Sequence, residues 1–283
     1  MTFNPKYSNP DVPHEVNVSE KTPVRDFLRL AIGVCLIVVV ISTVVFFTAR
    51  LWAPLIPFRY EDRYGEKMGG FNPDSDAPSR CEAEGAKALQ ALADGLAAEM
   101  ALPEGMKVRV HFDSSETPNA FATLGGNIVI FRGLLDHTHS ENALAMTLAH
   151  EIGHIKYRDP IVSLGGGVAV ALVFSAALDG SDGGALASWA IGMTQMSFSR
   201  EQEARADREA IAALRRYYGY TNGADEFFDY IVREHPTMSQ LPAFVSTHPT
   251  PPSRLKTIRE SFADEPQTLK PLPDAIQRLR QCK

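Results

Sequence analysis

The sequence lacks an excess of positive charge and any long run of like charges. Its 283 residues include 28 Lys and Arg against 34 Asp and Glu, which gives a formal net charge of −6 at pH 7. A nucleic-acid-binding protein usually carries a basic patch or a basic stretch interleaved with aromatic residues. Neither is present, so nucleic acid is excluded as an expected partner. Internal repeats are also absent from the sequence, and the length suits one sizeable domain with appendages.

Cysteine is scarce as well, with three residues in the whole chain. Cys35 lies inside an apolar run, whereas Cys81 and Cys282 stand near the two ends of the region that follows it. An exported domain would allow the last two to form a disulfide that fixes the C-terminal tail. A pair of unrelated free thiols is the equal alternative.

One long apolar run stands near the N-terminus. The polar residues 1–26, rich in Pro and Asn, predict a disordered tail. No charge occurs between Arg29 and Arg50, which gives about 20 apolar residues, or roughly 30 Å of helix, the thickness of a bilayer core. A cleaved signal peptide would have a shorter apolar region nearer the N-terminus. The run therefore predicts one transmembrane helix over 27–50.

The region after this run begins with a linker and then shows regular patterns. Prolines, glycines and scattered charges predict a linker over 51–79. An Ala-rich stretch with apolar residues at helical spacing predicts an amphipathic helix over 80–100, and alternation over 106–112 predicts a strand. Two β-prone runs around a Gly-Gly pair predict a hairpin over 119–131.

The stretch LAHEIGHIKYRDP carries two histidines four residues apart, His150 and His154. Because a helix turns about 100° per residue, the two imidazoles share one face and can hold one metal ion. Glu151 lies beside them, where its carboxylate can reach a water on that ion without being a ligand. Ser140 as an N-cap and Pro160 as a stop predict that this stretch is helical.

A third ligand is predicted downstream, in the stretch SFSREQEARAD. Glu203 and Asp207 are four residues apart on one face of a long helix expected over about 185–216. Taken alone, the stretch fits a solvated helix face with ion pairs. Together with the histidines it completes a site of two His and one Glu, which leaves the fourth position of zinc open for water. Asp207 would then accept the free ring N–H of one histidine.

Between these motifs, residues 161–178 are uncharged but diluted by three glycines and two serines. The run is at the threshold length for a second membrane span. The alternative is a helical hairpin that packs over the site or lies against a membrane. A hairpin packed over the site would act as a lid.

The order of PNAF…GGNIVIFRGLL, HEIGH, SREQEARAD and STHPTPPSRL resembles the membrane-associated zinc metallopeptidases, which include the CAAX prenyl proteases, the HtpX-type, Oma-type and BepA-like proteases. The resemblance covers roughly residues 80–260. It implies a mainly helical α+β domain of the zincin (gluzincin) type with a small β-sheet. The single N-terminal run favours the Oma- or BepA-like branch, although the tetratricopeptide array of BepA-type proteins is absent.

Residue by residue, the resemblance implies one Zn²⁺ per chain, held by His150, His154 and Glu203. Asp207 would support the ligands. Its Thr-His-Pro motif matches the sequence at His248, near the metal or the oxyanion, and Arg254 follows. A loop-bracing role for this histidine is the alternative.

The expected reaction is peptide hydrolysis. Zinc lowers the pKa of its bound water to about 7, Glu151 takes the proton, the hydroxide attacks the scissile carbonyl, and Glu151 hands the proton to the leaving amine. His248 or Arg254 would stabilise the oxyanion. The substrate is expected to add as a strand to the edge of the sheet; a buried strand without a substrate role is the equal alternative. The residues predicted for this edge are Asn127, Ile128, Val129, Ile130 and Phe131.

The expected protein is a single-pass inner membrane endopeptidase in quality control of unfolded membrane or envelope proteins. Its N-terminal span would contact the lipid bilayer, and its catalytic domain (80–262), followed by a tail over 263–283, would be periplasmic. An organellar inner membrane is the alternative location. The competing functions are a latent or chaperone-like zinc-binding module and a zinc hydrolase acting on a non-peptide bond. The sequence does not indicate an oligomeric state.

Overall fold

The computed structural model describes residues 23–52, 55, 57–62, 79–163, 198–234, 248, 252–262 and 269–282. The elements, in chain order, are α1 (Pro23–Trp52), α3 (Arg80–Ala98), β1 (Arg109–Asp113), β2 (Ala120–Thr123), η2 (Leu124–Gly126), β3 (Asn127–Phe131), α4 (Arg132–Asp136), α5 (Glu141–Lys156), α8 (Arg200–Tyr218), α9 (Glu226–Glu234), α11 (Pro252–Glu260) and α12 (Asp274–Leu279). Three stretches for which the sequence predicted a structure lie mostly outside the described residues. They are the expected tail (1–26), the expected linker (51–79) and the expected lid or second membrane span (161–178).

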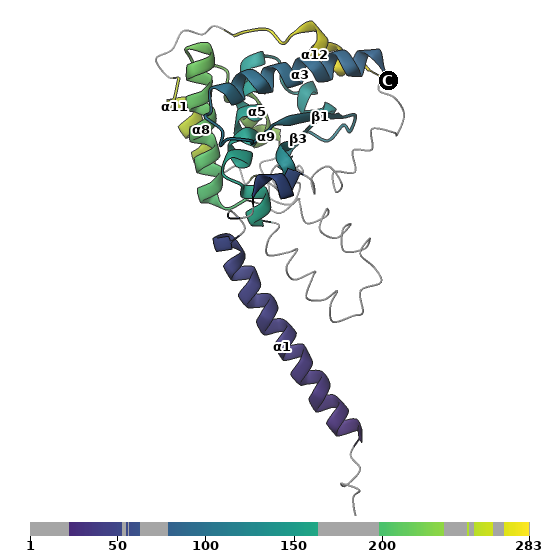
Figure 1. Cartoon of the computed structure of the whole chain (residues 1–283). Helices are drawn as coiled ribbons and strands as arrows, with labels where there is room; N and C mark the ends of the chain where they lie inside the picture. Colours follow the sequence, from purple (N-terminus) through teal and green to yellow (C-terminus); the bar gives the residue numbers. More distant parts are fainter. Residues whose placement is uncertain are drawn as a thin grey trace, which may run out of the picture.

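Helix α1 coincides with the predicted apolar run and extends away from the packed remainder of the chain (Figure 1). A membrane span needs about 20 predominantly apolar residues in a helix to match a bilayer core of about 30 Å. Within the described part of the chain, no helix meets the length and apolarity that crossing a membrane requires. The predicted localisation as a single-pass inner membrane protein is therefore wrong, and this finding does not support the predicted transmembrane helix over 27–50 or its contact with the lipid bilayer.

The predicted strands form one three-stranded sheet with the order β1-β3-β2. Strand β3 pairs in parallel with β1 and antiparallel with β2, with Ala122 opposite Ile128. The turn between β2 and β3 contains Gly125 and Gly126, whose φ angles of 74° and 75° favour glycine. This confirms the predicted hairpin. It also corrects the expected substrate edge, because Asn127–Phe131 is the central strand and both of its backbone edges are paired.

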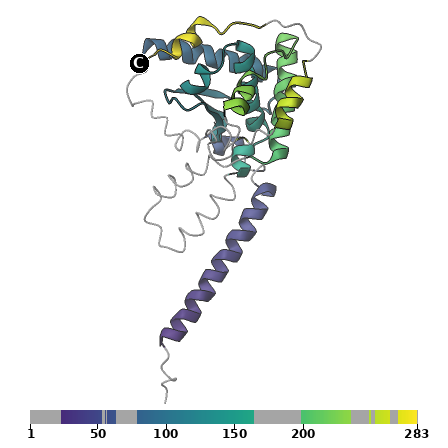
Figure 2. The same cartoon turned by 180° about the vertical axis from the view of Figure 1, so that it is seen from behind.

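The core lies between the sheet and the helices α3, α5 and α8, as the two opposite views show (Figures 1 and 2). Helix α5 is buried along nearly its whole length and packs along α8. Gly153 permits the close approach of these two helices, because a Cβ added there would lie 3.2 Å from the Cα of Ala206. Helix α3 begins with a capping box formed by Ser79 and Glu82.

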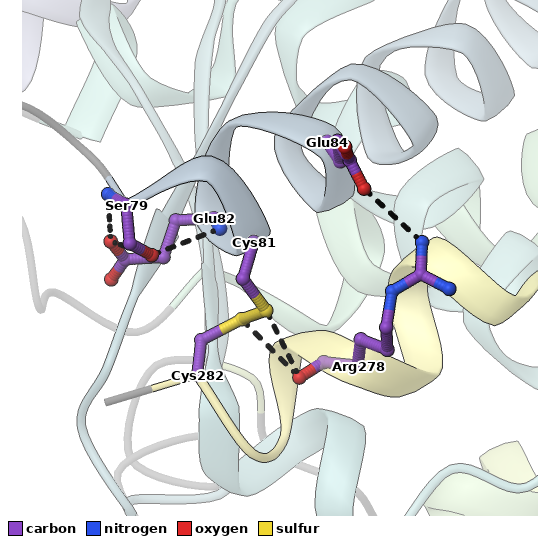
Figure 3. Close-up of a disulfide and its surroundings, with 6 residues drawn as sticks. All are labelled: Ser79, Cys81, Glu82, Glu84, Arg278 and Cys282. Carbon is purple, nitrogen blue, oxygen red and sulfur yellow. Dashed lines mark hydrogen bonds and ion pairs between the residues drawn. A yellow bond between two sulfur atoms is a disulfide. The ribbon is translucent and has the colours of Figure 1, made fainter.

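The C-terminal segment belongs to the packed domain, although residues 263–283 were expected to be a tail. Ile276 and Leu279 of α12 are fully buried. Leu279 packs directly on Gly85 of α3, where an added Cβ would lie 2.2 Å from the Leu279 Cγ atom. Cys81 and Cys282 form a disulfide across this contact (Figure 3). Of the two alternatives for these cysteines, the disulfide is the one present.

Candidate metal centre

The histidines of the HEIGH stretch lie on one face of α5, as predicted. The helix begins after Ser140, whose hydroxyl accepts a hydrogen bond from the Ala143 N–H. His150 and His154 are both fully buried, and their Nε2 atoms lie 3.1 Å apart. Two imidazole nitrogens that face one another at this distance need a shared proton or a cation between them.

Glu203 comes to the same point from α8. This helix begins at a capping box in which Ser199 and Gln202 exchange hydrogen bonds. The Glu203 carboxylate has Oε2 3.4 Å from the His150 Nε2 and Oε1 3.4 Å from the His154 Nε2. Burial would raise the pKa of Glu203, but the neighbouring histidines hold it well below its usual range, so this carboxylate is ionised.

His248 is the fourth member of the cluster. Its Nδ1 lies 3.0 Å from the Glu203 Oε1 and 3.3 Å from the His150 Nε2, and the residue is fully buried. One ligand atom from each of the four residues lies within 4.8 Å of the others. Imidazole nitrogens and a carboxylate are the donors that zinc takes in proteins, so the residues present fit this ion.

Asp207 stands behind His150, in the supporting position predicted for it. Its Oδ1 is 3.0 Å from the His150 Nδ1. Arg254 donates two hydrogen bonds to the same carboxylate, from Nε and from Nη2, each at 2.7 Å, and its Nη1 contacts the carboxylate of Glu203. Burial would raise the pKa of Asp207, but the hydrogen bonds from Arg254 and His150 lower it to about 2. Arg254 thus holds two carboxylates of the site in place.

A second supporting carboxylate was missed by the sequence analysis. Asp159 Oδ2 lies 2.9 Å from the His154 Nδ1, the ring nitrogen that points away from the cluster. Its other oxygen accepts hydrogen bonds from Gln202 Nε2 at 2.8 Å and from Arg205 Nη2 at 2.7 Å. Phe198 stacks on the His154 ring with the centroids 4.0 Å apart. Asp159 follows α5 in the turn before Pro160, so helical spacing does not reveal it.

Glu151 lies between the cluster and the sheet. It is fully buried, and its Oε2 accepts a hydrogen bond from the Ala122 N–H of β2 at 2.7 Å. Its Oε1 is 3.5 Å from the His248 Nε2. Because β2 is the strand at one edge of the sheet, the predicted general base contacts an edge strand, but not the one expected from the sequence.

A buried helix with two histidines and a glutamate from a second helix together define the metal site of a zinc metallopeptidase. Residues 83–261 match the model of peptidase family M48, and the chain belongs to this family. Its class is accordingly zinc metalloendopeptidase, and zinc is its metal. This confirms the resemblance seen in the motifs.

The chain is also similar to named proteases. The chain is 32% identical over 166 residues to the putative beta-barrel assembly-enhancing protease of Vibrio cholerae, covering 52% of this chain and 33% of the relative. It is 30% identical over 180 residues to the beta-barrel assembly-enhancing protease of Escherichia coli K12, covering 55% and 37%. It is 30% identical over 157 residues to the mitochondrial metalloendopeptidase OMA1 of Schizosaccharomyces pombe, covering 55% and 47%. The matched part is thus less than half of each relative.

Proposed function

We propose that this protein hydrolyses peptide bonds within unfolded polypeptides, with Glu151 as the general base. The observation that supports this role most directly is the position of Glu151, which lies between the metal-ligand cluster and the backbone of an edge strand. Zinc bound to the cluster supplies Lewis acidity, which acidifies water and polarises a carbonyl group. His150, His154 and Glu203 would hold it.

The side chains of the site then have separate roles in the reaction. Glu151 removes a proton from the attacking water and later donates it to the leaving amine. Asp207 and Asp159 fix the orientation of the two histidine rings by accepting their outer N–H groups. Arg254 positions Asp207 and Glu203 from behind the site, which favours a positioning role over the oxyanion role considered for it.

The substrate backbone would add to strand β2 (Ala120–Thr123). An extended peptide gains main-chain hydrogen bonds by extending a sheet at its edge, and among the described residues β2 pairs with β3 on one side only. A peptide on this edge lies beside Glu151, because the backbone of Ala122 already contacts that carboxylate. This replaces the central strand β3 in the role predicted for it.

The class of substrate follows from the chemistry and from the relatives. Backbone pairing at a sheet edge is insensitive to side chains and requires an extended chain, which an unfolded segment provides. Relatives are named for enhancing the assembly of beta-barrel proteins. We therefore extend the proposal to quality control of unfolded envelope proteins.

A second candidate, a latent form of the same enzyme, is favoured by the position of His248. Its Nδ1 lies within the ligand cluster, close to Glu203 and His150. A fourth protein ligand would occupy the position that catalytic zinc sites keep open for water. In this state the protein binds zinc and cleaves nothing until His248 moves away.

The test compares the full-length chain with its Glu151→Gln variant, using an unfolded protein as substrate and measuring bound zinc in both. We expect stoichiometric zinc in both proteins and a loss of cleavage by at least about 10²-fold in the variant, the scale of a general base. A variant that cleaves as fast as its parent would refute the assignment. If the parent binds zinc without cleaving, His248→Ala distinguishes the two candidates: cleavage gained in this variant supports latency, and continued inactivity argues against both.

A further inference from the structure

A short segment that precedes the motifs in the sequence contacts the turn that follows α5. Residues 57–62 form a helical turn that lies beside the sheet, at the base of the packed domain (Figure 1). We call these residues the N-terminal brace. Glu61 is only 4% exposed, although glutamate is rarely buried without a partner. The segment precedes the region matched by the family model, which begins at residue 83.

The partner of Glu61 is Arg158, directly after α5. The Glu61 Oε2 accepts from the Arg158 Nε at 2.7 Å and lies 2.6 Å from its Nη2. The Arg158 guanidinium also lies over the Phe58 ring, 5.7 Å from its centroid. Helix α5, which we call the zinc helix, is therefore held to the brace just beyond its C-terminal end by a partly buried, charge-assisted pair.

Arg158 has an unusual backbone conformation. Its φ angle is 60°, in the left-handed region that glycine usually occupies at the end of a helix. A non-glycine residue persists in this region when its surroundings hold it there. The ion pair with Glu61 and the contact with Phe58 are interactions of the side chain that do so.

The left-handed turn determines where the next residue points. Asp159 follows Arg158, and its Oδ2 accepts from the outer ring nitrogen of His154 at 2.9 Å. A different backbone angle at Arg158 would carry this carboxylate away from the histidine. The contacts thus connect Glu61 to Arg158, Asp159 and His154 in turn.

The brace also contacts the sheet, at the turn that ends β2 and at β1. The Glu61 Oε1 accepts from the Gly125 N–H at 3.3 Å, in the turn that ends β2. Phe58 approaches Gly126 so closely that an added Cβ there would lie 3.3 Å from its ring. Asp62 pairs with Arg109 of β1 at 2.6 Å. The N-terminal brace therefore contacts both the turn that follows α5 and the turn that ends β2.

We propose that Glu61 is a positioning residue for the zinc site, which acts by holding Arg158 in the left-handed turn that sets Asp159 against His154. Burial raises the pKa of Glu61 more than the neighbouring Arg158 guanidinium lowers it. The role rests on the zinc site and is independent of the substrate proposed above.

The test measures zinc affinity in the full-length chain by competition with a chelator. We expect Glu61→Gln to weaken zinc binding about five- to tenfold, at or just below the lower end of the range for groups that hydrogen-bond directly to metal ligands. Glu84→Gln is the matched control, because it makes the same change at an exposed ion-paired site on α3 and should leave zinc affinity within about twofold of the parent.

A second variant tests the route through the backbone. Glycine adopts the left-handed conformation without support, so in the Arg158→Gly background the loss of Glu61 should cost little. We expect Glu61→Gln combined with Arg158→Gly to bind zinc within about twofold of Arg158→Gly alone. This comparison remains informative if Glu61→Gln by itself does not fold.

Two results would overturn the proposal. One is a Glu61→Gln protein that binds zinc as its parent does, even if its melting temperature falls. The other is a double variant that loses the same factor relative to Arg158→Gly as Glu61→Gln loses relative to the parent, because additive losses mean that the two residues act separately. A parent that binds zinc tightly but cleaves nothing, and remains inactive as the His248→Ala variant, would contradict the proposed function and leave this inference standing.

Discussion

Two segments outside the family-matched region 83–261 hold opposite ends of the zinc helix, and they do so by different means. The N-terminal brace (57–62) meets the C-terminal end of α5 through charged side chains, Glu61 and Arg158. The C-terminal segment (269–282) meets the N-terminal end of α5 through backbone groups of Lys270 and an ion pair between Lys270 and Glu141. Apolar packing and a disulfide fix the same segment to α3.

The contacts of the C-terminal segment are those of a structural support. The Lys270 carbonyl accepts from the Glu141 N–H at 2.8 Å, which satisfies a donor of the first turn of α5. The Lys270 N–H donates to the Asn142 side chain at 2.8 Å. Helix α12 buries its apolar face against α3, and the disulfide fixes its end (Figure 3).

The comparison separates stability from site geometry. The C-terminal segment contacts α5 more than two turns before His150, and none of its contacts described above reaches a ligand. The brace ends one residue away from Asp159, which contacts His154 directly. We therefore expect damage to the C-terminal segment to lower the free energy of unfolding, and damage to the N-terminal brace to lower zinc affinity.

The largest expected effect is on stability. Replacing both Cys81 and Cys282 with serine should lower the free energy of unfolding by about 2–4 kcal/mol, because the reduced chain regains the entropy of a long loop. Urea unfolding of the zinc-free protein measures this loss. Zinc affinity should stay within about twofold of the parent.

Cys35→Ser is the control for this change, since Cys35 is free and exposed. A tenfold loss of zinc affinity in the double serine variant would remove the distinction between the two segments.

The intermediate effect is on zinc affinity. Asp159→Asn should weaken zinc binding about tenfold, or about 1.4 kcal/mol, because the amide no longer raises the basicity of His154 as a carboxylate does. Chelator competition measures this change, with exposed Asp136→Asn as the matched control. Unchanged affinity would show that the His154 ring is held by Phe198 and the cluster alone.

The smallest effect is expected at an ion pair that is close to Arg158 in the sequence but does not contact the metal-ligand cluster. Glu209 of α8 accepts from Lys156 Nζ at 2.8 Å and from the Tyr157 hydroxyl at 2.7 Å. Burial would raise the pKa of Glu209, but these two donors lower it below 4.5. At pH 7, Glu209→Gln should cost less than about 1 kcal/mol of unfolding free energy.

The pH dependence of this small effect has a definite sign. A carboxylate whose pKa is lowered on folding stabilises the protein above its unfolded pKa, and that contribution is lost as the pH falls through the folded value. The difference between parent and Glu209→Gln should therefore narrow below about pH 4.5. Urea unfolding at pH 7 and at acidic pH measures it, and a difference that widens in acid would contradict the assignment. Zinc affinity should not change.

The local patterns predicted most of what lies within single elements. The spacing of His150, His154 and Glu151 gave one buried helix face, and the spacing of Glu203 and Asp207 gave another. The Gly-Gly pair gave the hairpin turn. These predictions succeeded because helix and turn geometry depend on residues a few positions apart.

Predictions that required knowledge of neighbours were less successful. The strand 127–131 was expected at the edge and is central, because the pairing partners of a strand are not written in its own alternation. The localisation as a single-pass inner membrane protein, expected from apolar composition, was wrong, and the membrane span itself is not supported. The C-terminal tail turned out to carry a packed helix, because its few apolar residues meet a face of α3 almost two hundred positions away.

The sequence alone predicted which side chains the candidate site would bring together from α5 and α8: two imidazoles and two glutamate carboxylates, each placed by helical periodicity. Only the tertiary structure decided what surrounds them. Asp159 supports His154 from a turn, His248 joins the cluster across 45 residues from Glu203, and Glu61 reaches Arg158 across 97. Such contacts form because burying a polar group demands a partner, and the chain supplies that partner from whichever segment folding brings within reach.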